Sequence, residues 1–444
     1  MTAVRCVLAP VSVGISLFAT VFVITILFFI LPTAAQNTAV LELAPAFSPF
    51  YSIKHYDGLL SRGAVQIPSL SNMLTYVASI GADSSLPDDF LIIRPNAAGV
   101  DERNNVYVIE GGKIKIFNEL GKPAGIISGP YEIPKLTGSN ELEPFTISPT
   151  GFIELSYRLN IRGTSNELIE YYVYDKIFQY IAKVHENKYH TIIGYAGFTP
   201  KLYVLSPKEY IGITSELRIE NGTRILTERI IHYKNGNETV IATIERFAGI
   251  IPNIGERYTS ASLSYPPIAS GKYFWDVTSD LNVVYLNTLE DSVYSEKEGF
   301  YTIHFYNLKT GERNELKQLF KPEKIALRPS LPTLILPQGL TGVIAPVRSV
   351  VDTTTSFKYL ESVRNIIIDG ITLFFILNER NNNKEYKTDI FDVAEKKYLK
   401  AIYFPSDYTS CRIKNGFFYK TGYDEKARLD VIIKYIIDPD VYKR

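Results

Sequence analysis

The sequence predicts an all-β fold made of repeated small sheets, and three observations carry this prediction. The first is composition: 31 Tyr and 24 Phe, which favour strands, accompany 28 Gly and 24 Pro, which favour turns. The second is a strand–turn–strand unit that recurs six times. The third is an aromatic residue near the end of a further strand, downstream of each unit. With 444 residues, 46% of them hydrophobic, the chain is long enough for one large folded body or two domains.

The charge balance excludes one class of partner. The chain has 47 Lys and Arg against 47 Asp and Glu, a formal net charge of +0. Nucleic-acid binding by bulk charge needs a strongly basic surface. We therefore expect no nucleic-acid partner.

Each of the six units has two short apolar strands joined by a tight turn. The turns carry Asp, Asn, Ser, Pro or Gly, the residue types that sharp reversals require. The units are 99–101 with 106–109, 145–147 with 152–155, 202–205 with 210–213, 273–277 with 282–286, 365–368 with 372–376, and 411–413 with 417–419. The aromatic positions that follow them are Phe117, Tyr174, Tyr233, Tyr306, Phe391 and Tyr435.

This pattern gives about four antiparallel strands per unit. A four-stranded sheet cannot bury both of its faces alone, so neighbouring copies must cover them. Radial stacking of the copies does this and also protects the sheet edges. The prediction is a six-bladed β-propeller over residues 88–438; a β-sandwich would give no reason for six similar copies.

Spacing and ring closure leave two questions open. Successive aromatic positions lie 57, 59, 73, 85 and 44 residues apart by subtraction, so insertions interrupt several blades and a seventh blade stays possible. The largest insertion, 320–358, contains five Pro and is predicted to be a loop or a blade edge. The last unit lacks an outer strand, which we expect from 51–77, with 63–67 as a candidate, inside an N-terminal segment 36–87. Residues 439–444 are expected to be a frayed tail.

The N-terminus predicts export. Residues 13–31 are apolar apart from Gly, Ser and Thr, which suits a hydrophobic helix long enough to cross a bilayer. Thr33 and Ala35 are small residues at the positions that signal peptidase inspects. Residues 1–35 are therefore a signal peptide cleaved after Ala35 or, if uncleaved, a membrane anchor. The body is expected in the periplasm or outside the cell.

The first unit, 99–121, resembles an NHL-type repeat. The later units look like the wider family of exported bacterial six-bladed β-propeller proteins, and 413–419 with 431–435 are similar to that family's final blade. The resemblance implies a ring with a narrow central channel, whose faces serve binding in most members. It brings no catalytic motif, and the blade spacing departs from the family's more even repeats.

Motifs for chemistry are weak in this sequence. His185 and His190 are five apart, whereas the metalloprotease motif needs histidines four apart on one helical face. No G-x-S-x-G elbow and no phosphate-binding glycine loop occurs. Cys411 is interpreted as a buried small hydrophobe. The aromatic run 273–275 could stack on a ligand, but packing is the favoured role.

These observations support three function hypotheses. The first is a non-catalytic exported protein that binds a protein or glycan partner through loops on one face of the ring. This hypothesis assigns no catalytic, cofactor-binding or metal-ligating residue. The second is a lactonase-like hydrolase that holds a divalent ion, calcium for example, in the channel; Asp101, Asp276 and Asp369 are its candidate ligands by residue type. The third is a structural subunit of a surface assembly.

Overall fold

The computed structural model describes most of the chain beyond residue 66. The described residues are 67–81, 85–95, 97–110, 113–127, 141–142, 146–160, 167–176, 179–184, 201–220, 223–250, 273–288, 290–295, 297–324, 359–406 and 411–443. All of them belong to one compact unit, Ile53–Arg444. The apolar segment 13–31, Ala35, His185 and His190 lie outside them. Within the described ranges, no helix combines the length and the apolar character that a membrane crossing requires.

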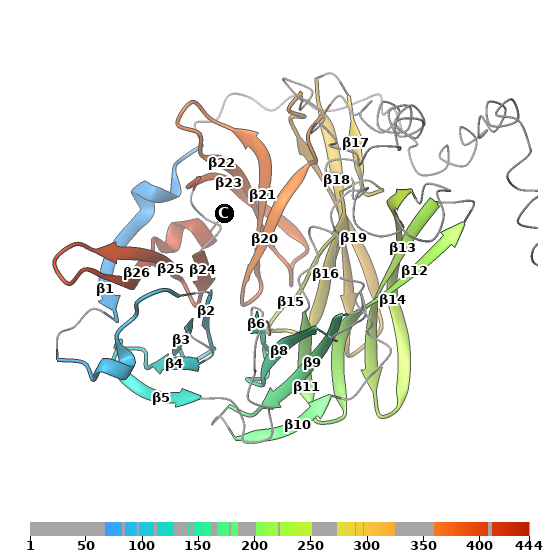
Figure 1. Cartoon of the computed structure of the whole chain (residues 1–444). Coiled ribbons are helices and arrows are strands. Elements are labelled where there is room, and N and C mark those ends of the chain that lie inside the picture. Colours follow the sequence, from blue (N-terminus) through green and yellow to red (C-terminus); the bar gives the residue numbers. More distant parts are fainter. Residues whose placement is uncertain are drawn as a thin grey trace, which may run out of the picture. The chain divides into compact units, whose positions relative to one another are not determined.

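The described residues form six antiparallel sheets, one for each predicted unit (Figure 1). Blade 1 consists of β2 (Ala97–Val100), β3 (Val106–Glu110), β4 (Lys113–Phe117) and β5 (Pro123–Ile127). Blade 2 consists of β7 (Thr146–Ile147), β8 (Ile153–Asn160), β9 (Glu167–Tyr174) and β10 (Tyr180–Val184), with β6 (Glu141–Leu142) beside β8. Blade 3 consists of β11 (Leu202–Ser206), β12 (Glu209–Glu220), β13 (Thr223–Lys234) and β14 (Asn237–Ile250).

The second half of the ring repeats this order. Blade 4 consists of β15 (Tyr273–Val277), β16 (Asn282–Asn287), β18 (Gly299–Asn307) and β19 (Arg313–Phe320), with β17 (Ser292–Tyr294) beside β18. Blade 5 consists of β20 (Val363–Asp369), β21 (Thr372–Arg380), β22 (Tyr386–Asp392) and β23 (Lys397–Phe404). Blade 6 consists of β24 (Cys411–Lys414), β25 (Phe417–Asp424), β26 (Leu429–Ile437) and β1 (Leu74–Ile80). Every predicted aromatic position lies on the third main strand of its blade.

The first strands of the six blades form a closed ring. Contacts join β2 to β7, β7 to β11, β15 to β20, β20 to β24 and β24 to β2. The remaining junction, between β11 and β15, is made by Tyr203 and Trp275, whose ring centroids are 5.7 Å apart. The ring is complete with six blades, so the all-β six-bladed prediction is confirmed and the uneven spacing does not require a seventh.

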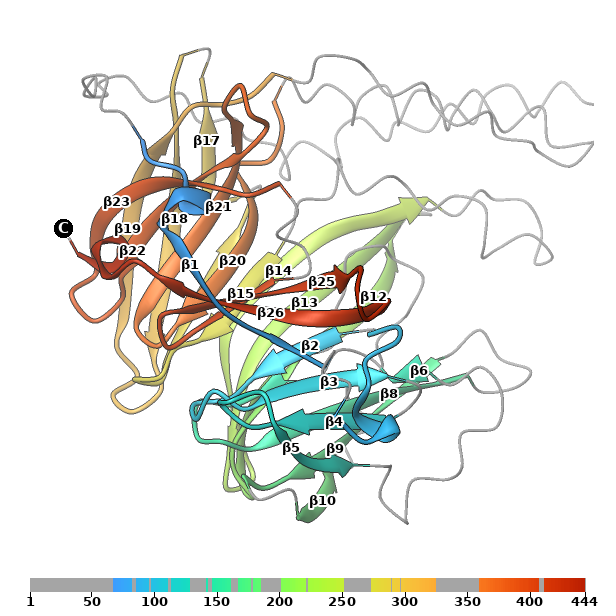
Figure 2. The same cartoon turned by 90° about the vertical axis from the view of Figure 1, so that its left-hand side faces the viewer.

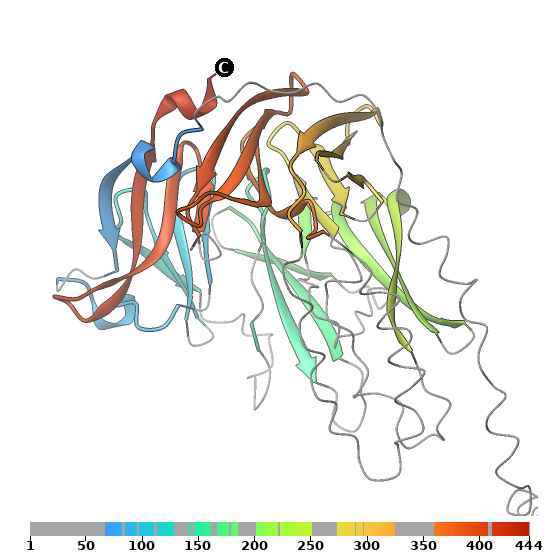
Figure 3. The ribbon, with the colours of Figure 1, turned by 90° about the horizontal axis from the view of Figure 1, so that it is seen from above.

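A strand from the N-terminal side completes the sixth sheet. β1 runs antiparallel to β26, from Leu74 opposite Ile437 to Ile80 opposite Ile432, with an irregularity between Tyr76 and Ala78. Figures 2 and 3 show β1 in blue and β26 in red lying side by side. β1 overlaps only the end of the expected stretch 51–77 and extends beyond it. Of the candidate 63–67, only Ile67 is described, and it is not in a strand.

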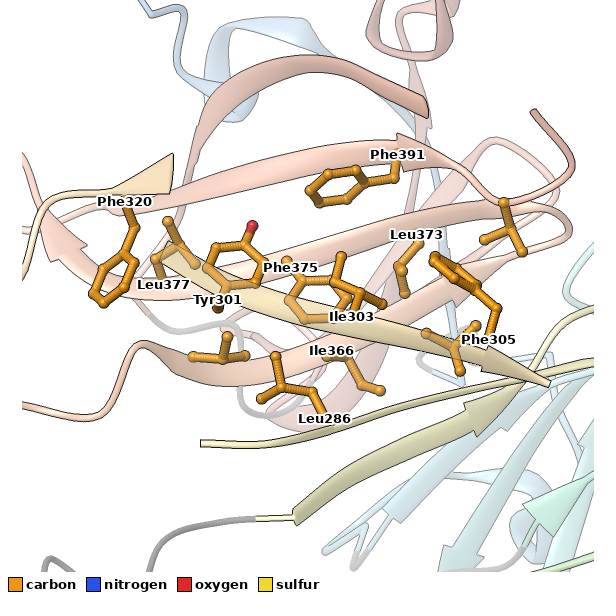
Figure 4. Packing of buried hydrophobic residues seen from close by; sticks show 13 residues of the cluster. Leu286, Tyr301, Ile303, Phe305, Phe320, Ile366, Leu373, Phe375, Leu377 and Phe391 are labelled. Atoms are coloured by element: carbon orange, nitrogen blue, oxygen red, sulfur yellow. The ribbon is translucent and has the colours of Figure 1, made fainter. Parts of the chain in front are cut away.

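The core consists of six separate clusters, one at each junction between blades. Clusters fill the junctions 1/2, 2/3, 3/4, 4/5, 5/6 and 6/1. Figure 4 shows the cluster between blades 4 and 5, where the ring of Tyr301 stacks on Phe375 with centroids 5.4 Å apart. Phe391 meets Phe375 edge-on at 5.8 Å. Each sheet thus buries its two apolar faces against its neighbours, as the repeat pattern predicts.

The C-terminal turn is packed, so the prediction of a frayed tail is wrong for 439–443. A short 3-10 helix, η9 (Pro439–Tyr442), begins after Asp438, whose side chain accepts a hydrogen bond from the Asp440 amide. Val441 is fully buried in the core between blades 5 and 6. The Asp438 amide donates to the carbonyl of Met73, over 2.9 Å, just before β1. An apolar residue at 441 and this bond hold the turn against the ring.

Stability is expected to depend on pH through blade 4. The His304 ring lies 2.8 Å from Asp291 and stacks on Tyr285. The hydrogen bond to Asp291 raises the pKa of His304 above 6.5, although burial opposes the shift. Its stabilising contribution is therefore complete below pH 6.5 and is lost as the pH rises through the raised pKa. Melting temperatures between about pH 5 and 9 should show a wild-type advantage over His304→Gln that shrinks with rising pH; a constant difference would contradict this.

Candidate functional site

A cavity of about 450 Å³ lies at the centre of the ring. All six blades contribute to its wall, mainly through their first strands and the turns that follow. This volume lies within the range of small-molecule sites in proteins. Among the described residues, its charged lining consists of Glu102, Lys201, Asp276, Arg412 and Lys414, three cationic against two acidic side chains. The described part of the wall is therefore mixed, with one more cationic than acidic side chain.

The most connected part of the wall is the junction of blades 3 and 4. The Lys201 ammonium lies 2.9 Å from an Asp276 carboxylate oxygen, and it donates to the Trp275 carbonyl over 3.1 Å. The Tyr203 hydroxyl donates to the other oxygen of Asp276. The ammonium also lies over two aromatic rings, 5.0 Å from the centroid of Tyr203 and 5.3 Å from that of Trp275. Asp276 is therefore held by a cation, a phenol and, over 2.7 Å, the Val277 amide.

Tyr203 stays protonated in this arrangement. Its side chain is buried, and burial raises its pKa well above 10.0, with the negative charge of Asp276 adding to the effect. The positive charge of Arg412 opposes the shift. Arg412 belongs to β24 of blade 6, opposite β11 in the ring. Its charge thus acts across the channel, and Tyr203 remains a hydrogen-bond donor rather than a nucleophile or base.

The turns between first and second strands link neighbouring blades at one end of the cavity. The Lys414 ammonium donates to the Glu102 carboxylate, and the Asn415 side-chain amide donates to the Glu102 backbone carbonyl over 3.1 Å. Between blades 4 and 5, the Ser279 backbone amide donates to the Gly370 carbonyl over 3.0 Å. Glu102 and Lys414 therefore connect blades 6 and 1, and their charges are satisfied within the ring.

The three carboxylates that the metal hypothesis requires are each bonded into the fold. Asp101 accepts from the amides of Arg103 and Asn105, from the Asn105 side chain and from the Tyr107 hydroxyl. Asp276 is engaged as described above. Asp369 accepts from three donors, the amides of Asn415 and Gly416 and the Tyr442 hydroxyl. Of the three, only Asp276 lines the cavity. The structure does not bring them together.

We expect Asp369→Asn to destabilise the protein by about 2 kcal/mol, because hydrogen bonds to a charged group contribute about 1.5–3 kcal/mol. In the asparagine variant, an NH₂ group would replace one carboxylate oxygen and would face a hydrogen-bond donor, so that hydrogen bond would be lost. Denaturant unfolding with and without calcium measures this. If the loss appears only in the presence of calcium, Asp369 is a metal ligand and the structural role fails.

Two other predicted features have structural positions. Cys411 is 2% exposed and belongs to the core between blades 5 and 6, which fits its interpretation as a small buried hydrophobe. In the aromatic run, Trp275 is 7% exposed and packs in the core between blades 3 and 4. Tyr273 and Phe274 are half-buried and pack against the cores on either side. No group of three His, Cys, Asp or Glu side chains suited to a metal ion occurs among the described residues.

Sequence reasoning missed the cationic side chains of the cavity. Lys201 lies directly before an inner strand, and Arg412 lies in the middle of another. Charged residues also lie within the first strands β15 and β20, so Arg412 in β24 does not stand out from the repeat pattern. The sequence therefore offered no specific signal for the cationic part of the cavity.

No family model and no curated protein matches the chain. Among solved structures, it is similar to a protein of unknown function from Bacteroides caccae, at 8% identity and a TM-score of 0.31, covering 72% of this chain and 84% of that one. It is also similar to the β-propeller domain of the Trilobed protease from Pyrococcus furiosus, at 12% identity and a TM-score of 0.32, covering 75% and 80%. A chain of the mitotic checkpoint complex is similar at 10% identity and a TM-score of 0.34, covering 86% of this chain and 99% of that one. The fold assignment rests on the six sheets of this chain.

Proposed function

We propose that this protein is a non-catalytic, exported binding protein that recognises a protein or glycan partner over one face of its ring. The observation that carries the proposal is the state of the three carboxylates that the metal hypothesis requires. The carboxylates accept hydrogen bonds from groups within the fold, at Asp101, Asp276 and Asp369 alike. Arg412, in contrast, is exposed and lines the cavity. Such a wall suits the recognition of a ligand group better than the capture of a divalent cation.

The rigid frame supports the same function. Six buried clusters and the closure of β1 on β26 fix the six blades relative to one another. Connecting segments positioned by a rigid scaffold are where binding residues concentrate. The repeats therefore provide support, and the segments between them, together with the cavity, provide recognition.

The export part of the proposal rests on residues 1–35. The apolar run 13–31 and the small residues Thr33 and Ala35 support a signal peptide, and a retained segment would anchor the ring to the membrane. Mass spectrometry of the mature protein should find a chain that begins at Gln36. A chain that begins at Met1 and is found in the membrane fraction would mean that the segment is retained as an anchor. A chain that begins at Met1 and is found in the cytoplasm would overturn the proposal of export.

Binding and hydrolysis are separated by two assays on the same preparation. The full-length protein is screened on arrays of defined glycans and peptides, and it is assayed with lactones and phosphotriesters, with calcium and with a chelator. We expect saturable binding of an array member and no turnover in either condition. Turnover that needs the divalent ion, and that Asp276→Asn abolishes while the melting temperature is maintained, would establish the hydrolase instead.

A further inference from the structure

Arg412 differs from the other charged residues of the cavity because it forms no ion pair with any acidic side chain that the structure describes. One guanidinium nitrogen donates to the Cys411 carbonyl over 2.8 Å, and the side chain is exposed. Within the described part of the chain, no carboxylate lies at salt-bridge distance from it. Lys201 is paired with Asp276, and Lys414 with Glu102. A guanidinium has five N–H donors in a planar fork, so most of its binding capacity is unused.

Arg412 and Asp276 occupy equivalent positions in the first strands of their blades. Arg412 is opposite Tyr419 and Asp276 is opposite Val284, each one position before the last apolar pair of its first strand. These pairs are Ile413 with Phe418 and Val277 with Val283. Asp276, which pairs with Lys201 of blade 3, therefore holds the position in blade 4 that Arg412 holds in blade 6. A ligand at Arg412 would have a second cation within the same cavity.

The rest of the wall at this site offers groups for an uncharged polar body. The Asn365 side-chain oxygen accepts from the Ile366 amide over 2.9 Å, while its amide nitrogen has no partner among the residues that the structure describes. Thr146 and the exposed Ser279 add hydroxyl groups to the lining. Amides and hydroxyls of this kind bind ligand hydroxyls. Apolar side chains, among them Ile366, Ile367 and the aromatic run 273–275, also line the wall.

We infer that the channel binds a sugar acid, with its carboxylate held by the guanidinium fork of Arg412. This inference rests on the proposed binding function and narrows its glycan partner to a ligand with an acidic sugar. Guanidinium and carboxylate fit each other through two parallel hydrogen bonds. Among the described lining residues, cationic side chains exceed acidic ones by one, an excess that a single carboxylate balances and a phosphate dianion would exceed. About 450 Å³ is room for a small ligand of one or two rings.

Titration calorimetry of the full-length protein tests this with three probes. These are glucuronate, glucose as its uncharged counterpart, and a short acidic peptide. We expect glucuronate to bind, to raise the melting temperature, and to bind at least about tenfold more tightly than glucose, because charged hydrogen bonds are worth that factor or more. Glucose binding equally well, or an absence of glucuronate binding up to about 10 mM, would overturn the inference.

Variants then assign the binding to Arg412. Arg412→Gln should weaken glucuronate about tenfold or more, and Arg412→Lys should fall between it and the wild type, since lysine keeps the charge but loses the fork. Arg428→Gln, the same change at an exposed turn between β25 and β26, is the matched control and should bind as the wild type does. Equal binding by Arg412→Gln would overturn the inference. Binding of the acidic peptide in place of glucuronate would also overturn it, yet would leave the proposed binding function standing.

Discussion

Phe375→Ala is expected to lower the free energy of unfolding by about 3–5 kcal/mol, the usual range for truncating a fully buried phenylalanine. Phe375 lies on β21 of blade 5 and is 0% exposed. Its ring stacks on Tyr301 of blade 4 and meets Phe391 of its own blade edge-on. The substitution would thus leave a cavity between two blades, where a sheet on either side prevents collapse.

Denaturant unfolding followed by tryptophan fluorescence measures this loss, since the single Trp275 lies in the neighbouring blade 4. Phe300→Ala is the matched control, because Phe300 is half-buried and precedes Tyr301 on β18. The loss of stability in Phe300→Ala should be less than half that in Phe375→Ala, because Phe300 buries less apolar surface in the folded protein. A loss below about 1 kcal/mol for Phe375→Ala would mean that blades 4 and 5 do not share a packed core.

A chain that begins at residue 85 is expected to lose about 3–6 kcal/mol of stability relative to one that begins at residue 67. The deletion removes Leu70 and Ile80, which are 0% and 1% exposed, and fully burying each such side chain contributes about 1.5–3 kcal/mol. It also removes the outer neighbour of β26, which pairs with β1 from Ile432 to Ile437 and with β25 on its other side. β26 would then be an exposed edge strand, and such an edge promotes association between molecules.

Thermal unfolding and size-exclusion chromatography compare the two chains, and the longer one is the control because it retains β1. We expect a lower melting temperature and concentration-dependent aggregates from the shorter chain. Addition of a peptide of residues 67–81 should restore part of the lost stability by pairing with β26. Equal melting temperatures would show that the ring does not depend on β1 for closure.

The blades could be predicted because their signals are local. Alternating apolar residues specify a strand that is covered on both faces, and the turn residues between paired strands specify a hairpin. In the last unit, Lys414-Asn415-Gly416-Phe417 forms a two-residue turn with both central residues at positive φ, which Asn and Gly tolerate best. The same reasoning placed every first and second strand, from β2 and β3 to β24 and β25.

The site could not be predicted in the same way. Asp101, Asp276 and Asp369 were chosen as candidate ligands by residue type, but whether a carboxylate is available depends on the donors that the fold brings to it. Tyr442 reaches Asp369 from the end of the chain, and Lys201 reaches Asp276 from another blade. These partners are 73 and 75 positions away in the sequence, and no local pattern connects them.

The sequence by itself determined that this protein is all-β, that it has six repeated blades, and which strands begin each blade. These properties follow from side-chain alternation and turn chemistry within some twenty neighbouring residues. Tertiary structure decided which strand closes the ring, that the C-terminal turn is packed, and that Arg412 lines a central cavity without an ion pair to a described carboxylate. Those outcomes depend on contacts between segments hundreds of residues apart, whose energies arise only when the ring is closed.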